Sequence, residues 1–364
     1  MYCSLIRQPG QRTIEVIDQR QLPHALVSVT IADAASAAAA IRDMTIRGAP
    51  LIGAVGAYGL AMALDRDAGD TALEGAHATL DRTRPTAVNL RWALDRVRAA
   101  VRALPVAARA DAAWREADAI VAEDIAINRA IGVHGLALLR ELGAGRLRVF
   151  NAMTHCNAGA LATCGFGTAT APLFLAKAEG LPIHVWVSET RPRMQGASLT
   201  AWELAQRGIA HTLFVDSASG LLMRRGEVNA VLVGADRVAA NGDVCNKIGT
   251  YEKALAAKDN GVPFYVALPS PTIDWTLASG DSIPIESRSA DEVLRVTGRA
   301  IAGREGSADT VSAEIAPART RAVNYAFDVT PARLVTGYIT ERGIARNAHE
   351  LATMHPERAR RRGS

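Results

Sequence analysis

The sequence predicts an α/β protein in which a mostly helical part, residues 1–145, precedes a part built on a parallel β-sheet, residues 146–364. Up to Gly145, apolar residues recur with the 3.6-residue spacing of amphipathic helices. After it, short β-rich runs alternate with helical stretches. The chain has 364 residues, of which 49% are hydrophobic, and this is enough for two domains with a substantial core. We therefore expect one domain on each side of this change in pattern.

Four helical segments are predicted in the first part. They lie at residues 31–44, 51–67, 89–104 and 112–142. Pro85 precedes the third segment, and the Gly-Ala-Gly stretch at residues 143–145 ends the fourth. A short pair of strands is expected near residues 11–18.

The second part contains six β-rich runs, at residues 147–153, 183–189, 209–216, 230–236, 263–269 and 332–340. Helical stretches lie between most of the first five β-rich runs. One of them, residues 199–208, ends in a glycine. Strands separated by helices indicate βαβ units, and such units form a parallel sheet. Residues 283–321 are charged and irregular in pattern, so we expect surface structure there.

Composition argues against several classes of protein. The net charge of +4 is a small excess for this length, and the basic stretch 358–364 reads as a solvated tail, so no nucleic-acid binding is expected. The longest apolar stretch, residues 49–65, is too short for a membrane span and is predicted to be a buried helix. The N-terminus lacks the apolar centre of a signal peptide, and the four cysteines show no framework spacing. We expect a cytoplasmic protein with reduced thiols and no membrane association.

Polar side chains follow four consecutive strands of the predicted sheet. They include Cys156 and Asn157 after the first run, Glu189, Arg191, Arg193 and Gln195 after the second, Asp216 after the third, and Asp236, Asn246 and Lys247 after the fourth. In an open parallel sheet, ligands bind outside the carboxyl ends of the strands. The sequence therefore predicts a site that combines a thiol, carboxyls, amides and cations, and the cations favour an anionic ligand.

Cys156 is the first candidate for chemistry at this site. A helix that starts after its strand would favour the thiolate through the positive end of the helix dipole. Asp236 is the second, because a carboxyl in an apolar pocket can stay protonated and act as an acid. His155 can either orient the thiol or be a hydrogen-bonded structural residue. We interpret Cys164 and Cys245 as core residues, and no Cys-x-x-Cys or His-x-x-x-His spacing predicts a metal site.

The segment "TIRGAPLIG" supplies a second piece of the site. Arg47 and Gly48 lead into a helix with Pro50 in its first turn, and the free N–H groups at such a helix start suit a phosphate. Arg91, in "NLRWA", offers a further cation. The glycines at 53, 56 and 59 lack the spacing of a dinucleotide-binding loop, and close helix packing explains them better.

Six motifs together resemble the S-methyl-5-thioribose-1-phosphate isomerases: "MTIRGAPLIG", "NLRWALDR", "THCNAGALAT", "SETRPRMQGASLTAWEL", "GADRVAANGDVCNKIGTYEKALAAK" and "AFDVTP". The resemblance covers residues 13–340. The superfamily also holds ribose-1,5-bisphosphate isomerases and the regulatory subunits of a eukaryotic translation-initiation exchange factor. The cysteine of "THCNAG" points to the isomerases.

The resemblance implies a helical N-terminal domain, a Rossmann-like C-terminal domain and a homodimer. It also implies Cys156 and Asp236 as the catalytic pair, with no metal and no organic cofactor. The residues that would hold the sugar phosphate are Arg47, Gly48, Ala49, Arg91, Gln195, Asn246 and Lys247.

The implied reaction explains why an acid and a base are needed. The anomeric carbon of an aldose 1-phosphate is locked as an ester, so an acid must protonate the ring oxygen while the C1–O4 bond breaks. Hydrogen then moves from C2 to C1, either through proton removal by a Cys156 thiolate or by direct hydride migration. Another pentose 1-phosphate, such as 5-deoxyribose 1-phosphate or ribose 1,5-bisphosphate, is an alternative substrate. A non-catalytic regulatory subunit is the alternative outside enzymes.

Overall fold

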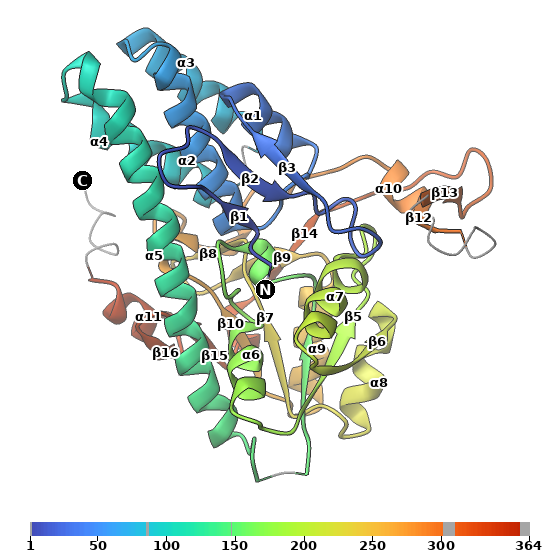
Figure 1. The fold of residues 1–364 in the computed structure, drawn as a ribbon. Coiled ribbons are helices and arrows are strands. Elements are labelled where there is room, and N and C mark those ends of the chain that lie inside the picture. The colour runs from blue at the N-terminus through green and yellow to red at the C-terminus, as the bar shows by residue number, and fades with distance from the viewer. Residues whose placement is uncertain (1, 85–86, 147, 301–309, 357–364) are drawn as a thin grey trace.

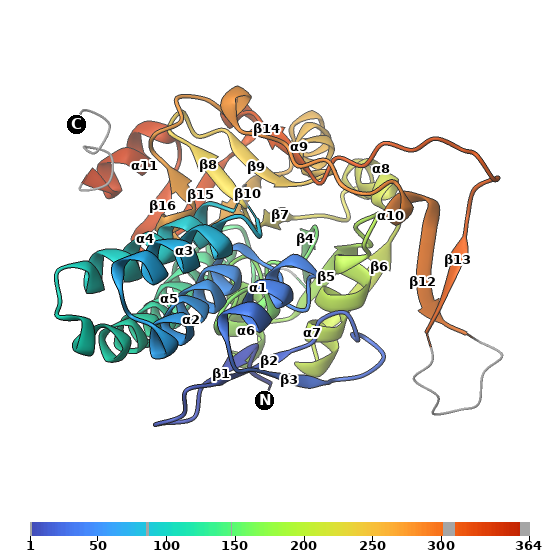
Figure 2. The same cartoon turned by 90° about the horizontal axis from the view of Figure 1, so that it is seen from above.

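The computed structural model describes residues 2–84, 87–146, 148–300 and 310–356. A helical region carries a small antiparallel sheet and lies against one end of a larger α/β region (Figures 1 and 2). The α/β class is thereby confirmed. Pro85 and the basic stretch 358–364, on which two expectations rested, lie outside the described residues.

The four predicted helices of the first part are confirmed as α1 (Ala34–Arg42), α2 (Ala49–Arg66), α4 (Val88–Arg102) and α5 (Val106–Glu141). A further helix, α3 (Asp70–Asp81), was not predicted from the sequence. Helix α2 is buried along most of its length because its glycines admit neighbouring helices: a Cβ at Gly56 would lie 2.4 Å from Leu90, and one at Gly59 would lie 2.8 Å from Ala37. Instead of two strands near the N-terminus, three form a sheet: β1 (Leu5–Ile6), β2 (Ile14–Ile17) and β3 (Ser28–Ile31).

All six predicted strands of the second part are confirmed. They belong to a seven-stranded sheet of order β16-β15-β10-β7-β4-β5-β6, with bounds β4 (Phe150–Thr154), β5 (Ile183–Ser188), β6 (Ala210–Phe214), β7 (Ala230–Val233), β10 (Phe264–Ala267), β15 (Gly337–Thr340) and β16 (Gly343–Ala345). Every pair is parallel except β15 with β16. Alternate strand residues enter two separate apolar clusters, so both faces of the sheet are covered.

Helices cover the two faces of this sheet. The apolar cluster of one face contains residues of α5 and α6 (Ala171–Ala178), and the π-helical turn Gly196–Thr200 leads into α7 (Ala201–Gln206), whose Leu204 joins the same cluster. The cluster of the other face contains residues of α8 (Ser219–Arg224), α9 (Thr250–Asp259) and α11 (Ala348–Met354).

A second, four-stranded sheet lies beyond the carboxyl end of β7. Its order is β11-β8-β9-β14, from β11 (Ile273–Asp274), β8 (Arg237–Ala239), β9 (Val244–Lys247) and β14 (Phe327–Thr330). This sheet was not predicted from the sequence, because its strands are short and two of its pairings, β11 with β8 and β14 with β9, join residues that lie far apart in the chain. Among the described residues, no helix combines the length and apolar character needed to cross a bilayer.

The expectation of irregular surface structure at residues 283–321 is wrong in part. The segment contains helix α10 (Asp291–Leu294) and the hairpin of β12 (Arg295–Arg299) with β13 (Thr310–Glu314), which projects from the body (Figure 2). Its first residues, Ile283 and Pro284, line an internal cavity. Residues 301–309 are outside the described part of the chain.

Helix α5 links the helical region to the large sheet. It has 36 residues; it packs on α2 and α4 as well as on α6 and β15. The predicted domain boundary after residue 145 falls just beyond its last residue, Glu141, and stays a prediction. The close contact with α6 depends on Gly135, where a Cβ would lie 2.3 Å from Pro172 Cγ.

We expect Gly135→Ala to lower the free energy of unfolding by about 1–3 kcal/mol, because the new methyl group overpacks the α5–α6 contact. Gly75→Ala is the matched control, since Gly75 lies inside α3 and a Cβ added there would meet no atom within 4 Å. It should stabilise the protein by about 0.5–1 kcal/mol through helix propensity alone. Urea unfolding of both variants measures this, and equal effects at the two positions would contradict the packing argument.

Candidate active site

Cys156 lies just after β4, at the carboxyl end of the large sheet. Its backbone has a φ of 62° and is held by two threonines: its N–H donates to Thr190 Oγ1 at 2.8 Å, and its carbonyl accepts from Thr200 Oγ1 at 2.6 Å. The residue is 6% exposed and lines the cavity. The backbone contacts therefore aim the thiol at the cavity.

No α-helix starts directly after Cys156, so the expected stabilisation by a helix dipole is wrong. A single 3₁₀ turn, Ala160–Ala162, follows, and α6 begins only at Ala171. The positive group near the thiol is a guanidinium instead of a helix N-terminus: Arg47 Nη2 lies 4.0 Å from Cys156 Sγ.

Arg47 is anchored at the start of α2. Its Nη1 donates to Asn157 Oδ1 at 2.7 Å and its Nη2 to the Asn157 carbonyl at 2.8 Å. Gly48 follows with a φ of 100°, and a Cβ there would lie 2.4 Å from the carbonyl oxygen of Ala162. Only glycine allows this approach. Pro50 stands in the first turn of α2, as predicted.

Asp236 enters the cavity from the segment after β7. Its backbone N–H donates to the carbonyl of Cys245 at 2.9 Å. Burial raises the pKa of Asp236, while Lys247, Arg47 and Arg84 oppose that rise and Glu286 adds to it. Burial wins, so the neutral acid persists to higher pH than for an exposed aspartate.

Cations and amides complete the polar lining. Lys247, in β9, is buried, donates from Nζ to the Ala326 carbonyl at 2.7 Å and lies 4.6 Å from the ring centre of Phe327. Asn246 Nδ2 donates to Thr250 Oγ1 at 3.1 Å. Gln195 Oε1 is buried and has no hydrogen-bond partner among the described residues, so it can accept a hydrogen bond from a hydroxyl group of a ligand.

One cavity lies among these side chains, with about 700 Å³ of space that includes open solvent. Cys156 and Asp236 both line it, together with Arg47, Gly48, Ala49, Gln195, Lys247, Arg84, Arg237 and Cys245. An apolar wall is formed by Met44, Ile52, Ile283, Pro284 and Phe327. An adjoining cavity of about 430 Å³, at the N-terminus of α2, shares Arg47, Cys156 and Asp236 and adds Asn246.

The structure therefore brings together eight of the nine predicted site residues; Arg91 lies apart. It occupies an outward face of α4, has a side chain 59% exposed and pairs with Asp81. The cavity cation from this part of the chain is Arg84, seven positions earlier, in the loop before α4. Helix geometry explains the difference, because α4 starts only at Val88 and its own turn carries Arg91 away from the cavity.

His155 and Asp216 hold the backbone around the cavity through hydrogen bonds. His155 Nε2 lies 2.8 Å from the Ile248 carbonyl, and burial together with nearby Lys253 lowers the pKa of His155 to about 3, so the ring is neutral. Asp216 accepts hydrogen bonds from the N–H groups of Thr190 and Arg191 and so fixes the loop that holds the Cys156 backbone. These contacts favour the structural interpretation of His155.

The other two buried cysteines differ in their surroundings. Cys164 is buried in the core of the helical region, as expected, whereas buried Cys245 also lines the cavity. Within the described ranges, no group of three or more His, Cys, Asp or Glu side chains is placed to hold a metal ion.

The chain is similar to known proteins over most of its length. The Initiation factor 2 subunit family matches residues 45–347. The methylthioribose-1-phosphate isomerase of Rhizobium meliloti (strain 1021) is 57% identical over 351 residues, which are 95% of each chain. That of Acidiphilium cryptum (strain JF-5) is 57% identical over 349 residues, 95% of this chain and 94% of the relative.

Two solved structures share the whole fold. The 5-methylthioribose 1-phosphate isomerase from Pyrococcus horikoshii OT3 has a TM-score of 0.83 and 36% identity, covering 98% of this chain and 96% of that chain. The translation initiation factor eIF-2B, subunit delta, from A. fulgidus has a TM-score of 0.78 and 36% identity, covering 97% and 99%. With 57% identity over nearly the whole chain to the first group, the protein belongs to the Initiation factor 2 subunit family and, within it, to the methylthioribose-1-phosphate isomerases.

Proposed function

We propose that the cavity converts S-methyl-5-thio-α-D-ribose 1-phosphate to S-methyl-5-thio-D-ribulose 1-phosphate, a step of methionine salvage. The observation that carries this is the single cavity that Cys156 and Asp236 line together with the cations Arg47, Arg84 and Lys247. The 57% identity to methylthioribose-1-phosphate isomerases supports the substrate.

In the proposed reaction, Asp236 donates its proton to the ring oxygen as the C1–O4 bond breaks. A Cys156 thiolate then removes the proton from C2, and the electrons of that bond form a C1–C2 double bond. Return of a proton to C1 and loss of the proton from the C2 hydroxyl give the ketose. Acid and base each act on a different atom, so one cavity must hold both.

The cavity lining favours a methylthio group over a second phosphate. Arg47, Arg84 and Lys247 supply the positive charge for one phosphate, and the α2 N-terminus adds free N–H groups beside Gly48 and Ala49. The apolar wall from Met44 to Phe327 suits a thioether, which needs dispersion contacts rather than charge. Ribose 1,5-bisphosphate would place its second phosphate against that wall.

A non-catalytic regulatory subunit is the second candidate, because an initiation-factor subunit shares the fold at 36% identity. The coexistence of Cys156 and a protonatable Asp236 in one cavity favours the enzyme. We also propose, on the resemblance, a cytoplasmic homodimer with domains at residues 1–145 and 146–364.

Cys156→Ser and Asp236→Asn should each lower turnover of the methylthio sugar phosphate roughly 10²- to 10⁴-fold, because each removes one proton-transfer group. A ketose assay on purified protein measures this, with circular dichroism to confirm the fold. Wild-type protein that forms no ketose would support the regulatory alternative, and full activity in either variant would remove that residue from the mechanism.

The carboxyl of Asp236 should remain protonated above the ordinary aspartate value of 3.8 and lose its proton as the pH rises through its raised pKa. The pKa of Asp236 is raised because burial disfavours the charged form of the carboxyl. Infrared difference spectra of wild type minus Asp236→Asn, recorded across pH, should show the protonated-carboxyl band decline over that range. A band that has already vanished at pH 3.8 would contradict the assignment of the acid.

Turnover in heavy water should place deuterium at C1 of the ketose, because a thiolate base exchanges its proton with solvent before returning it. Mass spectrometry of the product measures the incorporation. Complete absence of deuterium would instead support hydride migration and leave Cys156 without the role of base.

A further inference from the structure

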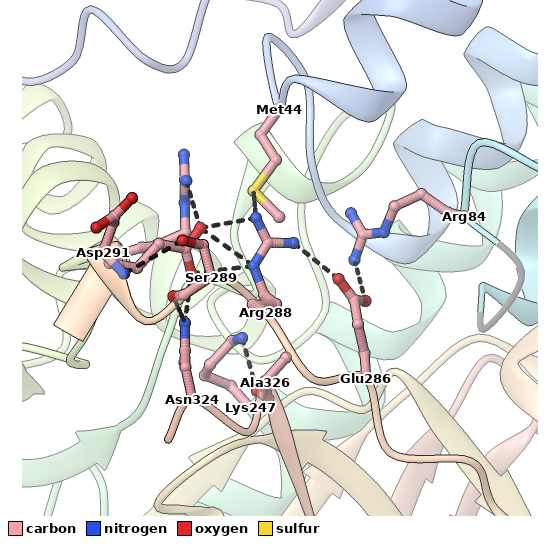
Figure 3. Close-up of polar contacts among 11 residues, drawn as sticks. Met44, Arg84, Lys247, Glu286, Arg288, Ser289, Asp291, Asn324 and Ala326 are labelled. Atoms are coloured by element: carbon pink, nitrogen blue, oxygen red, sulfur yellow. Dashed lines mark hydrogen bonds and ion pairs between the residues drawn. The ribbon is translucent and has the colours of Figure 1, made fainter. Parts of the chain in front are cut away.

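The segment that follows Ile283 and Pro284 contacts the helical region. Ile283 and Pro284 line the cavity, and Glu286 and Arg288 come next along the chain. Figure 3 shows both side chains between Met44 and Arg84 of the helical region and the strand entry at Ala326, where Lys247 is held. One short segment thus meets groups from both sides of the cavity.

Glu286 joins two guanidinium groups. Its Oε2 lies 3.4 Å from Arg84 Nη2, and its Oε1 accepts from Arg288 Nη1 at 2.8 Å (Figure 3). The side chains of Arg84 and Glu286 are only 12% and 21% exposed. A buried guanidinium next to a carboxylate is held in direction as well as in position. Arg84, which lines the cavity, therefore has its guanidinium beside the Glu286 carboxylate.

Arg288 is itself immobilised. Its Nη2 and Nε donate to the two oxygens of Glu292 at 2.8 and 3.0 Å, and its Nη2 lies 3.6 Å from Met44 Sδ. Glu292 also accepts from Arg193 at 2.9 Å and from Asn324 at 2.8 Å, and these contacts lower the pKa of Glu292 to about 2. The network is therefore ionised near neutral pH and anchored to three other segments.

We propose that Glu286, held by Arg288, is a positioning residue that sets the orientation of Arg84 toward the substrate phosphate. This inference rests on the proposed isomerase function. Arg288 also holds Met44, so the same segment fixes a cation and part of the apolar wall. This one segment then sets the distance between Arg84, which binds the phosphate end of the substrate, and Met44, which contacts the methylthio end.

Glu286 has a second effect on the site that a purely structural residue would lack. Four charged groups act on Asp236: the cations Lys247, Arg47 and Arg84, and the anion Glu286. Loss of the Glu286 charge removes the one member of this set that raises the pKa of Asp236. Its removal should therefore move the titration of Asp236 to lower pH.

A double-mutant cycle on the full-length protein tests the proposal. Glu286→Gln should raise KM roughly tenfold with a smaller change in kcat, because Arg84 loses its orientation, and Arg84→Gln should do the same or more. The double variant should be no worse than Arg84→Gln alone. Arg295→Gln and Glu314→Gln, which alter an exposed ion pair of the projecting hairpin, are controls and should match wild type. A wild-type KM in Glu286→Gln, or strictly additive effects, would overturn the proposal.

A second variant and a second readout separate this inference from the proposed function. Arg288→Lys keeps the charge but cannot reach Glu286, Glu292 and Met44 together, so KM should rise in the same direction by a smaller factor, with thermal unfolding as the check on folding. The infrared titration of Asp236 in Glu286→Gln should shift to lower pH and requires no turnover. Failure of wild type to form ketose would refute the proposed function alone, whereas an unshifted titration would refute the role of Glu286.

Discussion

The contact between Arg47 and Asn157 is the constraint on which the site depends. It joins the start of α2 to the turn after β4, and it forms because Gly48 lets the two backbones approach where any side chain would meet Ala162. Asn157 is fixed in turn by buried Glu203, to which its Nδ2 donates at 2.7 Å. Without this approach, the helical region would carry its cation and its free N–H groups away from the thiol.

The site works as a balance between burial and charge. Burial penalises the ionised form of Asp236, and three nearby cations favour it, yet the pKa of Asp236 is still raised. One of these cations, Arg47, also lies beside Cys156, with 4.0 Å between its Nη2 and the cysteine Sγ. In the proposed reaction this positive cluster would hold the anionic substrate, while burial keeps the pKa of Asp236 above its ordinary value despite the cations.

The residues at the strand ends could be predicted because strands and helices alternate regularly along this part of the sequence. Cys156, Gln195 and Asp236 each follow a strand of clear pattern, and the carboxyl ends of such strands converge. The substrate-binding role of Arg91, which the resemblance implies, stays a prediction, because its side chain pairs with Asp81 and does not line the cavity. Glu286 and Arg288 were missed because their segment lacks periodicity, and their partners in the helical region lie 202 and 244 positions away.

By itself, the sequence determined the class of the fold, six of the seven strands of the main sheet and the chemical types present at their ends. These follow from local periodicity and turn chemistry, which neighbouring residues encode. Tertiary structure alone decided which cation enters the cavity, which charge fixes its direction and which wall is apolar. Those outcomes depend on the contacts of Glu286 with Arg84 and of Arg288 with Met44, which are set by the packing of whole helices and strands.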